Sequence, residues 1–438
     1  MKSIQGLTET ARIEAADLPQ HVGETVQMHG AVHAIHDMGG FAFLTLRKKD
    51  AVVQCVCPGG FSLEGITEEC AVIVTGTVQA ESRAPGGYEL AVTAIELLSA
   101  PAAPLPVPVH KWKMNLNLDT DLNLRPVTLR NLRERSIFKV QEGLVRGFRA
   151  YLTQQGFTEI HTPKIQTKGA EGGANIFKLE YFHRRAYLAQ SPQFYKQMMV
   201  GVYERVFETG PVFRAEKHST VRHLNEYTSL DFEMGYISSF EDVMQMETGM
   251  LQYAFALLQR EYAADLQRLK AEIPDVSSIP AVRFDEARQL AAEKYNRPIR
   301  NPWDLEPEEE VAIGRYFQEE CGSDFVFVTH YPSRKRPFYA MDDPEDPRYT
   351  LSFDLLFRGM EITTGGQRIH DYNMLVEKMQ SRDMDPADIQ SYMMAFQYGM
   401  PPHGGLGIGL ERLTMRLLGL QNVRECTLFP RDLHRLEP

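Results

Sequence analysis

The chain has 438 residues, long enough for two or three domains whose cores need no disulfide or metal. With 47 Lys and Arg against 58 Asp and Glu, its formal net charge is −11, and 43% of its residues are hydrophobic. This composition excludes wholesale disorder, and the acidic balance alone favours a small-molecule enzyme over a nucleic-acid binder.

The sequence shows no sign of membrane insertion or secretion. No run approaches the roughly 18 apolar residues that a membrane-spanning helix needs, and the first residues lack an apolar signal region. The five cysteines are odd in number and scattered, which predicts reduced structural thiols. We therefore expect a cytoplasmic protein with no membrane partner.

The first hundred residues predict a small β-barrel. Short strand-like runs are separated by Gly, Pro and charged turns, and they lie at 26–40, 41–50, 51–57, 70–80 and 88–99. Five strands, with a helical piece expected over 61–69, suit an OB-type barrel in residues 1–103, although another small barrel or sandwich would share the pattern.

A stiff connection should follow the barrel, because Pro recurs at 101, 104, 106 and 108. We expect a hinge over 104–135. The stretch from Lys111 to Arg149 is rich in Lys and Arg, which predicts either a solvated helix face or a path for nucleic-acid phosphates.

Residues 136–438 mix helices and strands, which indicates an α+β domain. An amphipathic helix should end near Gly156, and a helical insertion is expected around 240–310. The segment 213–236 predicts two strands joined by a basic loop, with Arg214 and Glu216 on one strand face. Arginine there could hold the phosphates of a bent triphosphate, whereas an isolated hairpin of this kind could equally be a solvated surface.

Two further segments carry chemistry. Residues 404–419 form a Gly-rich strand that opens into a helix, which lets a ligand approach the backbone closely. Asp354 and Glu361 flank a Gly turn, and two such carboxylates suit Mg²⁺ when phosphates supply the remaining oxygens.

The order of these segments resembles motifs 1, 2 and 3 of class II aminoacyl-tRNA synthetases. The matching stretches are GFTEIHTPKI, FRAE with RHLNEYTSLDFEM, and GGLGIGLERL. Together with the barrel they resemble the Asp/Asn/Lys subgroup over nearly the whole chain. Within it, YLAQSPQFYKQ and GGQRIHD look like the aspartyl type found in archaea and eukaryotes. The resemblance implies an antiparallel sheet flanked by helices.

The resemblance implies roles for individual residues. Arg214 would be catalytic, holding the α-phosphate of ATP; Glu216 would accept from the adenine amino group, and Tyr227 and Arg412 would enclose the ring. The further implied ATP-binding residues are Arg222, His223, Leu224, Glu361 and Gly409. Asp354 and Glu361 would carry Mg²⁺. No protein nucleophile is needed, because positioning and electrostatics suffice.

For the amino acid, Lys196 and Arg368 would grip the side-chain carboxylate and reject the neutral amide of asparagine. Glu171, Gln193 and Asp231 would face the α-amino group, and Thr364 would complete the aspartate site. In the barrel, Phe43, Gln54 and Glu89 match anticodon-reading positions, while His33 and Pro85 resemble residues near the third anticodon base in enzymes of relaxed specificity.

The resemblance thus implies an aspartate–tRNA ligase that uses ATP and Mg²⁺. Its expected partners are L-aspartate, tRNA-Asp and tRNA-Asn, a second copy in a homodimer, and an amidotransferase that would consume Asp-tRNA-Asn. The alternatives are a strictly tRNA-Asp-specific enzyme, an asparagine-activating or tRNA-independent asparagine synthetase, and an inactive RNA-binding paralogue. The intact set of ATP-binding residues argues against the last.

Overall fold

The structure is a computed structural model, and it describes residues 13–49, 51–167, 175–296 and 298–437. The chain divides into two compact units. The smaller comprises residues 1–115 and 130–132, and the larger comprises 116–129 and 133–438. No helix among the described residues has the length and apolar character that a bilayer crossing requires.

The smaller unit is a closed barrel, as the sequence predicts. Its strands follow the order β1-β2-β3-β5-β4: β1 (Thr25–Asp37), β2 (Ala42–Arg47), β3 (Val52–Cys57), β5 (Tyr88–Ser99) and β4 (Ala71–Ala80). Alternate side chains fill the interior, among them Leu44, Leu46 and Cys55. Short 3-10 turns at Ala15–His21 and Pro85–Gly87 complete it. The helical piece expected over 61–69 is wrong, since that segment contains only turns.

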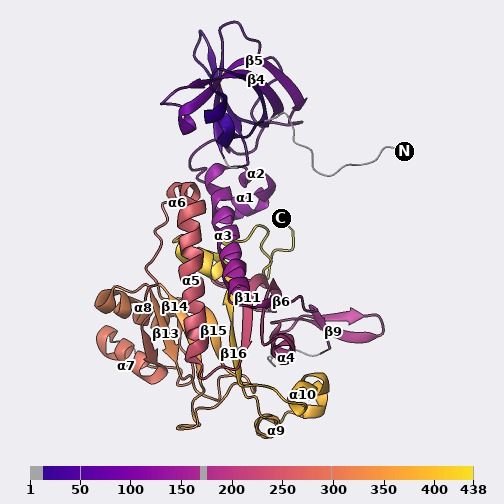
Figure 1. Cartoon of the computed structure of the whole chain (residues 1–438), viewed down its shortest axis with the longest axis vertical. Coiled ribbons are helices and arrows are strands. Elements are labelled where there is room, and N and C mark those ends of the chain that lie inside the picture. Colours follow the sequence, from indigo (N-terminus) through magenta and orange to yellow (C-terminus); the bar gives the residue numbers. More distant parts are fainter. Residues whose placement is uncertain (1–12, 50, 168–174, 297, 438) are drawn as a thin grey trace. The chain divides into compact units, whose positions relative to one another are not determined.

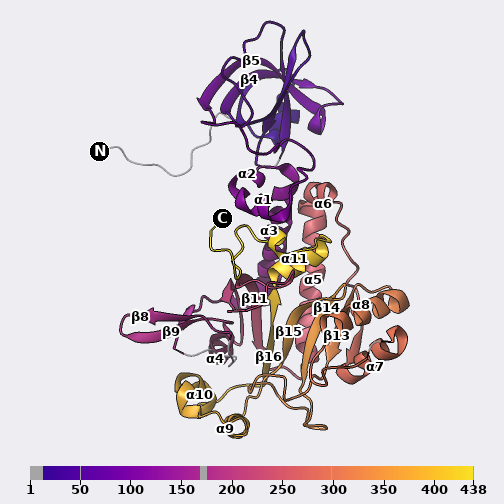
Figure 2. The ribbon, with the colours of Figure 1, turned by 180° about the vertical axis from the view of Figure 1, so that it is seen from behind.

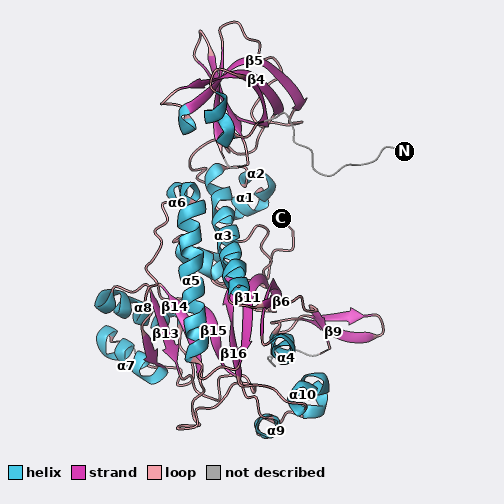
Figure 3. Cartoon of the chain, viewed as in Figure 1, coloured by secondary structure: helices cyan, strands magenta, loops and turns pink. Residues whose placement is uncertain are grey.

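The larger unit is built on an eight-stranded sheet, mostly antiparallel (Figures 1 and 3). Its strands, in spatial order, are β12 (Ala281–Arg283), β13 (Phe325–Thr329), β14 (Ser352–Phe357), β15 (Glu361–Gln367), β16 (His403–Gly409), β11 (Glu226–Gly235), β10 (Arg205–Phe213) and β6 (Thr158–Glu159). A three-stranded sheet of β7 (Ile165–Gln166), β9 (Arg184–Leu188) and β8 (Lys178–Tyr181) stands beside it. These findings confirm the predicted fold class.

Two long helices lie side by side along the sheet, α3 (Leu132–Gln154) and α5 (Glu241–Glu261) (Figure 1). They touch through glycines of α3, because a Cβ at Gly147 would lie 2.6 Å from the Cα of Ala254. On β11, Leu230 and Phe232 belong to the core with these helices, whereas Ser229 and Asp231 face the other side of the strand. The period of two thus gives the sheet one apolar face and one polar face.

The remaining helices surround the sheet. The insertion contributes α6 (Ala263–Leu269), α7 (Phe284–Tyr295) and α8 (Pro307–Cys321); the others are α1 (Leu118–Asn123), α2 (Arg125–Thr128), α4 (Gln193–Tyr203), α9 (Tyr372–Gln380), α10 (Gln390–Gln397) and α11 (Leu410–Leu417). The end of β16 leads directly into α11 (Figure 2). The helical insertion expected around 240–310 begins with α5 and is interrupted at Tyr262, between α5 and α6.

Several members of the basic stretch between Lys111 and Arg149 are buried or form ion pairs, and the phosphate path stays a prediction. Arg125 is fully buried and donates to the main-chain oxygens of Glu425, Thr427 and Leu428. Other members pair with carboxylates: Arg130 with Glu69, Lys139 with Glu142, Arg146 with Glu261, and Arg149 with Glu159. Most of these acids lie on other elements, which is why the local sequence does not reveal the pairing.

Candidate active site

A cavity of about 570 Å³ opens on the polar face of the larger unit. Strands β11, β14, β15 and β16, the connection after β10, the start of α4 and the start of α11 contribute to its lining. Every residue of the catalytic region named above as a site candidate lines it, apart from Glu171, which lies outside the described residues. The candidates brought together are Gln193, Lys196, Arg214, Glu216, Arg222, His223, Leu224, Tyr227, Asp231, Asp354, Glu361, Thr364, Arg368, Gly409 and Arg412.

Arg214 and Glu216 lie in the connection after β10, and their predicted placement on a strand face is wrong. Strand β10 ends at Phe213, opposite Glu226. Beyond that point Asn225 holds the connection, because its Nδ2 donates to the main-chain oxygens of Arg214 (2.7 Å) and Glu216 (3.2 Å). The alternation of residues in the sequence does not show that the strand ends at Phe213. The pairing of β10 with β11 determines that end.

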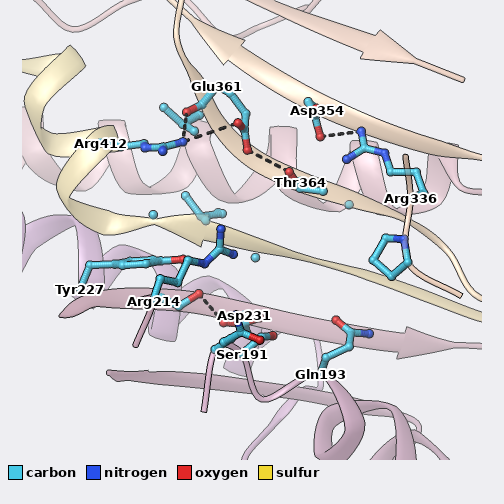
Figure 4. Close-up of a pocket in the computed structure, with 18 of the residues that line it drawn as sticks. Ser191, Gln193, Arg214, Tyr227, Asp231, Arg336, Asp354, Glu361, Thr364 and Arg412 are labelled. Atoms are coloured by element: carbon cyan, nitrogen blue, oxygen red, sulfur yellow. Dashed lines mark hydrogen bonds and ion pairs between the residues drawn. The ribbon is translucent and has the colours of Figure 1, made fainter. Parts of the chain in front are cut away.

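Tyr227 and Arg412 lie on opposite sides of the open space in Figure 4. Arg412 is fixed by hydrogen bonds to the main-chain oxygens of Glu361 (3.2 Å) and Arg222 (3.3 Å). The guanidinium carbon of Arg214 lies 5.8 Å from the centre of the Tyr227 ring. An aromatic ring facing a guanidinium plane suits a flat, electron-rich base between them.

Arg222 meets an acid that the sequence analysis does not single out. Its Nη2 contacts both carboxylate oxygens of Glu310 on α8, at 2.8 and 3.0 Å. Glu310 also accepts from the main-chain nitrogen of Glu361 at 3.0 Å. The insertion helix is thereby tied to two candidate ATP-binding residues. Nearby, burial and the positive charge of Arg412 lower the pKa of His223, which favours a neutral ring.

Asp354 on β14 and Glu361 on β15 lie at the edge of the same space. The Nη2 of Arg336, a second residue not predicted, donates to Oδ1 of Asp354 at 2.7 Å, and Thr364 donates to Glu361 at 3.0 Å (Figure 4). Burial raises the pKa of the Asp354 carboxyl against the opposing effect of Arg336, and the charge of Glu361 raises it further. A cation between the two carboxylates would relieve that repulsion.

These two carboxylates fit a divalent cation only in part. The described residues hold no group of three or more His, Cys, Asp or Glu side chains arranged for a metal. Hard cations such as Mg²⁺ accept phosphate and water oxygens as further ligands, so two carboxylates suffice where a triphosphate is bound. The donor set therefore suits a metal that arrives with its nucleotide.

The far end of the cavity holds a buried cluster of four charges. The Nζ of Lys196 lies 3.0 Å from Asp231 and 3.3 Å from Glu233, and the Nε of Arg368 donates to Glu233 at 2.8 Å. All four side chains are buried. Burial alone would raise the pKa of Glu233, but Arg368 and Lys196 hold it below its usual value. Lys196 and Arg368 thus each face a carboxylate of the protein, and the charges of the cluster sum to zero.

The glycines of β16 permit this cluster to form. A Cβ at Gly405 would lie 2.2 Å from Oε2 of Glu233 and 2.2 Å from the main-chain oxygen of Phe232. No side chain fits at that distance, so glycine is required for the close approach of β16 and β11. The sequence analysis expects the glycines of this strand to let a ligand approach the backbone. In the structure they also let β16 approach the buried charge cluster.

In the barrel, three candidate anticodon residues occupy neighbouring strands. Phe43 on β2 is half-buried and is not one of the side chains of the barrel core. Gln54 on β3 pairs in register with Glu89 on β5, and its Nε2 donates to that carboxylate at 2.8 Å. Pro85 is exposed in the turn before β5.

His33 differs from the other barrel candidates because it is only 5% exposed. The Nη1 of Arg47 lies 3.3 Å from its Nδ1, and Arg47 forms a two-pronged ion pair with Glu69. His33 can therefore influence a bound base only through its neighbours. Arg47 and Lys48 are both largely buried, in ion pairs with Glu69 and Glu14.

Arg336, which lines the cavity, and Glu310, which holds a lining residue, are two of the residues that sequence reasoning misses. Arg336 stands in the basic run RKRPFY, a signal that could have marked it, whereas Glu310 lies in an acidic helix start that suggests only a helix N-terminus.

The fold and cavity define a nucleotide-dependent ligase of the class II synthetase type. The sequence matches the family described as tRNA synthetases class II (D, K and N) over residues 117–433 and an OB-fold nucleic acid binding domain over 26–98. The chain belongs to this synthetase family.

Individual relatives narrow the similarity. The chain is 51% identical to an aspartate–tRNA(Asp/Asn) ligase of Deinococcus radiodurans, covering 96% of this chain and 98% of the relative. It is 48% identical to the ligase of the same name from Thermus thermophilus, covering 98% and 100%. Among solved structures, an asparaginyl-tRNA synthetase from Pyrococcus horikoshii complexed with asparaginyl-adenylate superposes with a TM-score of 0.89 at 31% identity, covering 98% of this chain and 99% of that one.

Proposed function

We propose that this chain is an aspartate–tRNA ligase that charges both tRNA-Asp and tRNA-Asn. It would join L-aspartate to AMP with release of pyrophosphate, then transfer the aspartyl group to the 3′ end of the tRNA. The observation that carries the proposal is the single cavity with phosphate-binding arginines at one end and the buried, electroneutral cluster at the other.

The first step needs charge stabilisation rather than a protein nucleophile. The α-carboxylate of aspartate attacks the α-phosphorus of ATP, and the bond to the pyrophosphate oxygen breaks. Arg214 holds the phosphoryl oxygens as their charge changes, and Arg222 with His223 binds the outer phosphates. Asp354 and Glu361 would hold Mg²⁺, which neutralises the leaving pyrophosphate when it is bound.

Aspartate is favoured over asparagine by a balance of charge. Lys196 and Arg368 offset Asp231 and Glu233. The α-carboxylate, common to both amino acids, lies at the α-phosphorus beside Arg214 and stays outside the cluster. Within the cluster aspartate adds one ammonium and one side-chain carboxylate, so the sum stays at zero, with Asp231 meeting the ammonium and the cations meeting the carboxylate. Asparagine adds the ammonium alone and leaves a buried positive charge uncompensated, which is costly in a low dielectric.

The exposed side of the barrel supports tRNA binding. Phe43 offers a ring on which a splayed base can stack, and Gln54 and Glu89 offer polar groups for base edges. The two bacterial relatives carry names that include both tRNA-Asp and tRNA-Asn, which agrees with relaxed specificity. A ligase that makes Asp-tRNA-Asn needs an amidotransferase downstream, and we include that enzyme as a partner.

Pyrophosphate exchange tests the amino-acid assignment. Exchange into ATP should require Mg²⁺ and aspartate; exchange that requires asparagine would instead support the second candidate, an asparaginyl enzyme like the structural neighbour from Pyrococcus horikoshii. Arg368→Ala should lose aspartate-dependent exchange by orders of magnitude while ATP still binds. Arg260→Ala, an exposed arginine of α5, is the matched control.

Charging of purified transcripts tests the tRNA assignment. Both tRNA-Asp and tRNA-Asn should accept aspartate, and failure of tRNA-Asn would restrict the enzyme to tRNA-Asp.

We also propose a homodimer formed around the segment that resembles motif 1, where Pro163 and Ile165 are exposed. Light scattering at micromolar concentration would show the mass of a monomer if that is wrong. The five unpaired cysteines agree with a cytoplasmic enzyme.

A further inference from the structure

A chain of buried hydrogen bonds leads from the cavity into the protein behind α4. Gln193, which lines the cavity, donates through Nε2 to Oε1 of Gln197 at 3.0 Å. The Nε2 of Gln197 lies 3.0 Å from Nε2 of His403, whose Nδ1 lies 2.8 Å from the main-chain oxygen of Pro401. The hydroxyl of Tyr392 also donates to Oε1 of Gln197 at 3.1 Å. All four side chains are at most 3% exposed.

The direction of every bond in this chain follows from one backbone carbonyl. The oxygen of Pro401 can only accept, so the hydrogen of a neutral His403 resides on Nδ1, and Nε2 can only accept. Gln197 must then turn its NH2 group toward His403 and its oxygen toward Tyr392 and Gln193. Gln193 must in turn donate its NH2 group to Gln197.

The neutral state of His403 agrees with its surroundings. Burial lowers the pKa of this histidine to about 4 against the opposing effect of Glu233, so at neutral pH the ring carries no charge. The main-chain nitrogen of Arg368 donates to the main-chain oxygen of His403 at 2.9 Å, which ties the ring's own residue to the charge cluster.

One atom of Gln193 remains for the cavity, its Oε1. The only hydrogen bond that the described residues make with this side chain is the one donated by Nε2. In Figure 4 the oxygen of Gln193 is turned toward the side on which Ser191 and Asp231 lie, and the nitrogen is turned away. A carbonyl oxygen there accepts from a cationic donor, whereas an NH2 group would repel one.

We propose that His403 and Gln197 are positioning residues that fix the polarity of the Gln193 amide, so that its oxygen accepts a hydrogen bond from the α-ammonium group of the amino acid. This inference rests on the proposed aspartate site. It adds that Gln197 and His403 determine the orientation of the Gln193 amide in that site. Gln197 and His403 touch no substrate; they act through Gln193.

The test is a mutant cycle read by pyrophosphate exchange. His403→Phe frees the Gln197 amide to invert, and the KM for aspartate should rise about tenfold, the scale of one hydrogen bond to a charged group, while the KM for ATP stays within twofold. Gln193→Glu puts an acceptor opposite the Gln197 oxygen, and it should raise the aspartate KM by at least about tenfold. Combining the two changes lets Gln197 invert and donate to the introduced carboxylate, so the double variant should bind aspartate better than Gln193→Glu alone.

A merely structural role would not give this rescue. If both substitutions only disturbed packing, their effects on the aspartate KM would add in the double variant. Tyr392→Phe is the matched control: it removes a hydrogen bond to the same Gln197 oxygen but leaves His403 to set the direction, so the aspartate KM should change less than about threefold. If His403→Phe does not fold, as judged by its thermal transition, Gln197→Met replaces it in the cycle. It removes the Gln197 oxygen that opposes the carboxylate of Gln193→Glu, so the double variant should again bind aspartate better than Gln193→Glu alone.

Additive effects in the double variant, or an unchanged aspartate KM in His403→Phe, would overturn the inference. Failure of the proposed function has a different signature, because the unmodified enzyme would then show no aspartate-dependent exchange at all.

Discussion

Replacing Glu247 by glutamine should stabilise the larger unit, and increasingly so as the pH rises. Glu247 lies on α5, is fully buried, and accepts through Oε1 from Thr363 of β15 at 2.6 Å. Its Oε2 has no hydrogen-bond partner among the described residues. Burial raises the pKa of this carboxyl from 4.5 to about 8, so the folded protein holds it as a neutral acid at pH 7.

The magnitude follows from proton linkage. Between pH 4.5 and about 8 the unfolded chain releases a proton that the folded chain keeps, so stability falls as the pH rises, by about 1.4 kcal/mol per pH unit. At pH 7 the accumulated cost is about 3 kcal/mol, and below the unfolded pKa it vanishes. Glutamine has the same shape, still accepts from Thr363, and holds no such proton.

Thermal unfolding of the full chain at pH 5 and pH 7 measures the effect. For a unit of this size about 3 kcal/mol corresponds to a rise in Tm of roughly 6–12 °C for Glu247→Gln, with little change at pH 5. The control is Glu241→Gln on the same helix, where the exposed side chain should give a shift of a few degrees at most. A Tm difference between Glu247→Gln and the unmodified chain that is the same at both pH values would refute the reasoning.

Three further outcomes are expected. Gly405→Ala should destabilise the larger unit by at least about 2 kcal/mol and raise the aspartate KM, because its Cβ would lie 2.2 Å from Glu233; an unchanged urea midpoint would contradict this close approach. Glu310→Gln should weaken the hold on Arg222 and raise the KM for ATP several-fold while that for aspartate is unaffected, and equal rises in both would point to a general disturbance instead. The affinity for tRNA should fall with salt despite the net charge of −11, as filter binding between 50 and 200 mM would reveal; no salt dependence would argue against phosphate contacts.

The fold could be predicted well from the sequence where local pattern decides. The five barrel strands have runs of alternating apolar residues between turn residues, and the barrel was confirmed with a domain match over 26–98. The Gly turn between Asp354 and Glu361 likewise gives the hairpin of β14 and β15. The segment 61–69 shows the limit of prediction from local pattern. Its weak preference for a helix does not decide its structure, and between two barrel strands it forms turns.

The sequence by itself determined which chemical groups are present and in what order, since motif spacing and residue type are local properties. The converging positions of Lys196, Arg214, Asp354 and Arg412 in one cavity agree with that order, and their individual roles stay predictions. Only the tertiary structure decided which charge meets which. Glu233 pairs with Arg368, and Arg146 and Arg149 of the basic stretch pair with Glu261 and Glu159. Such pairs form between residues far apart in sequence, because electrostatic energy depends on distance in space and on burial, and neither can be read from the order of residues.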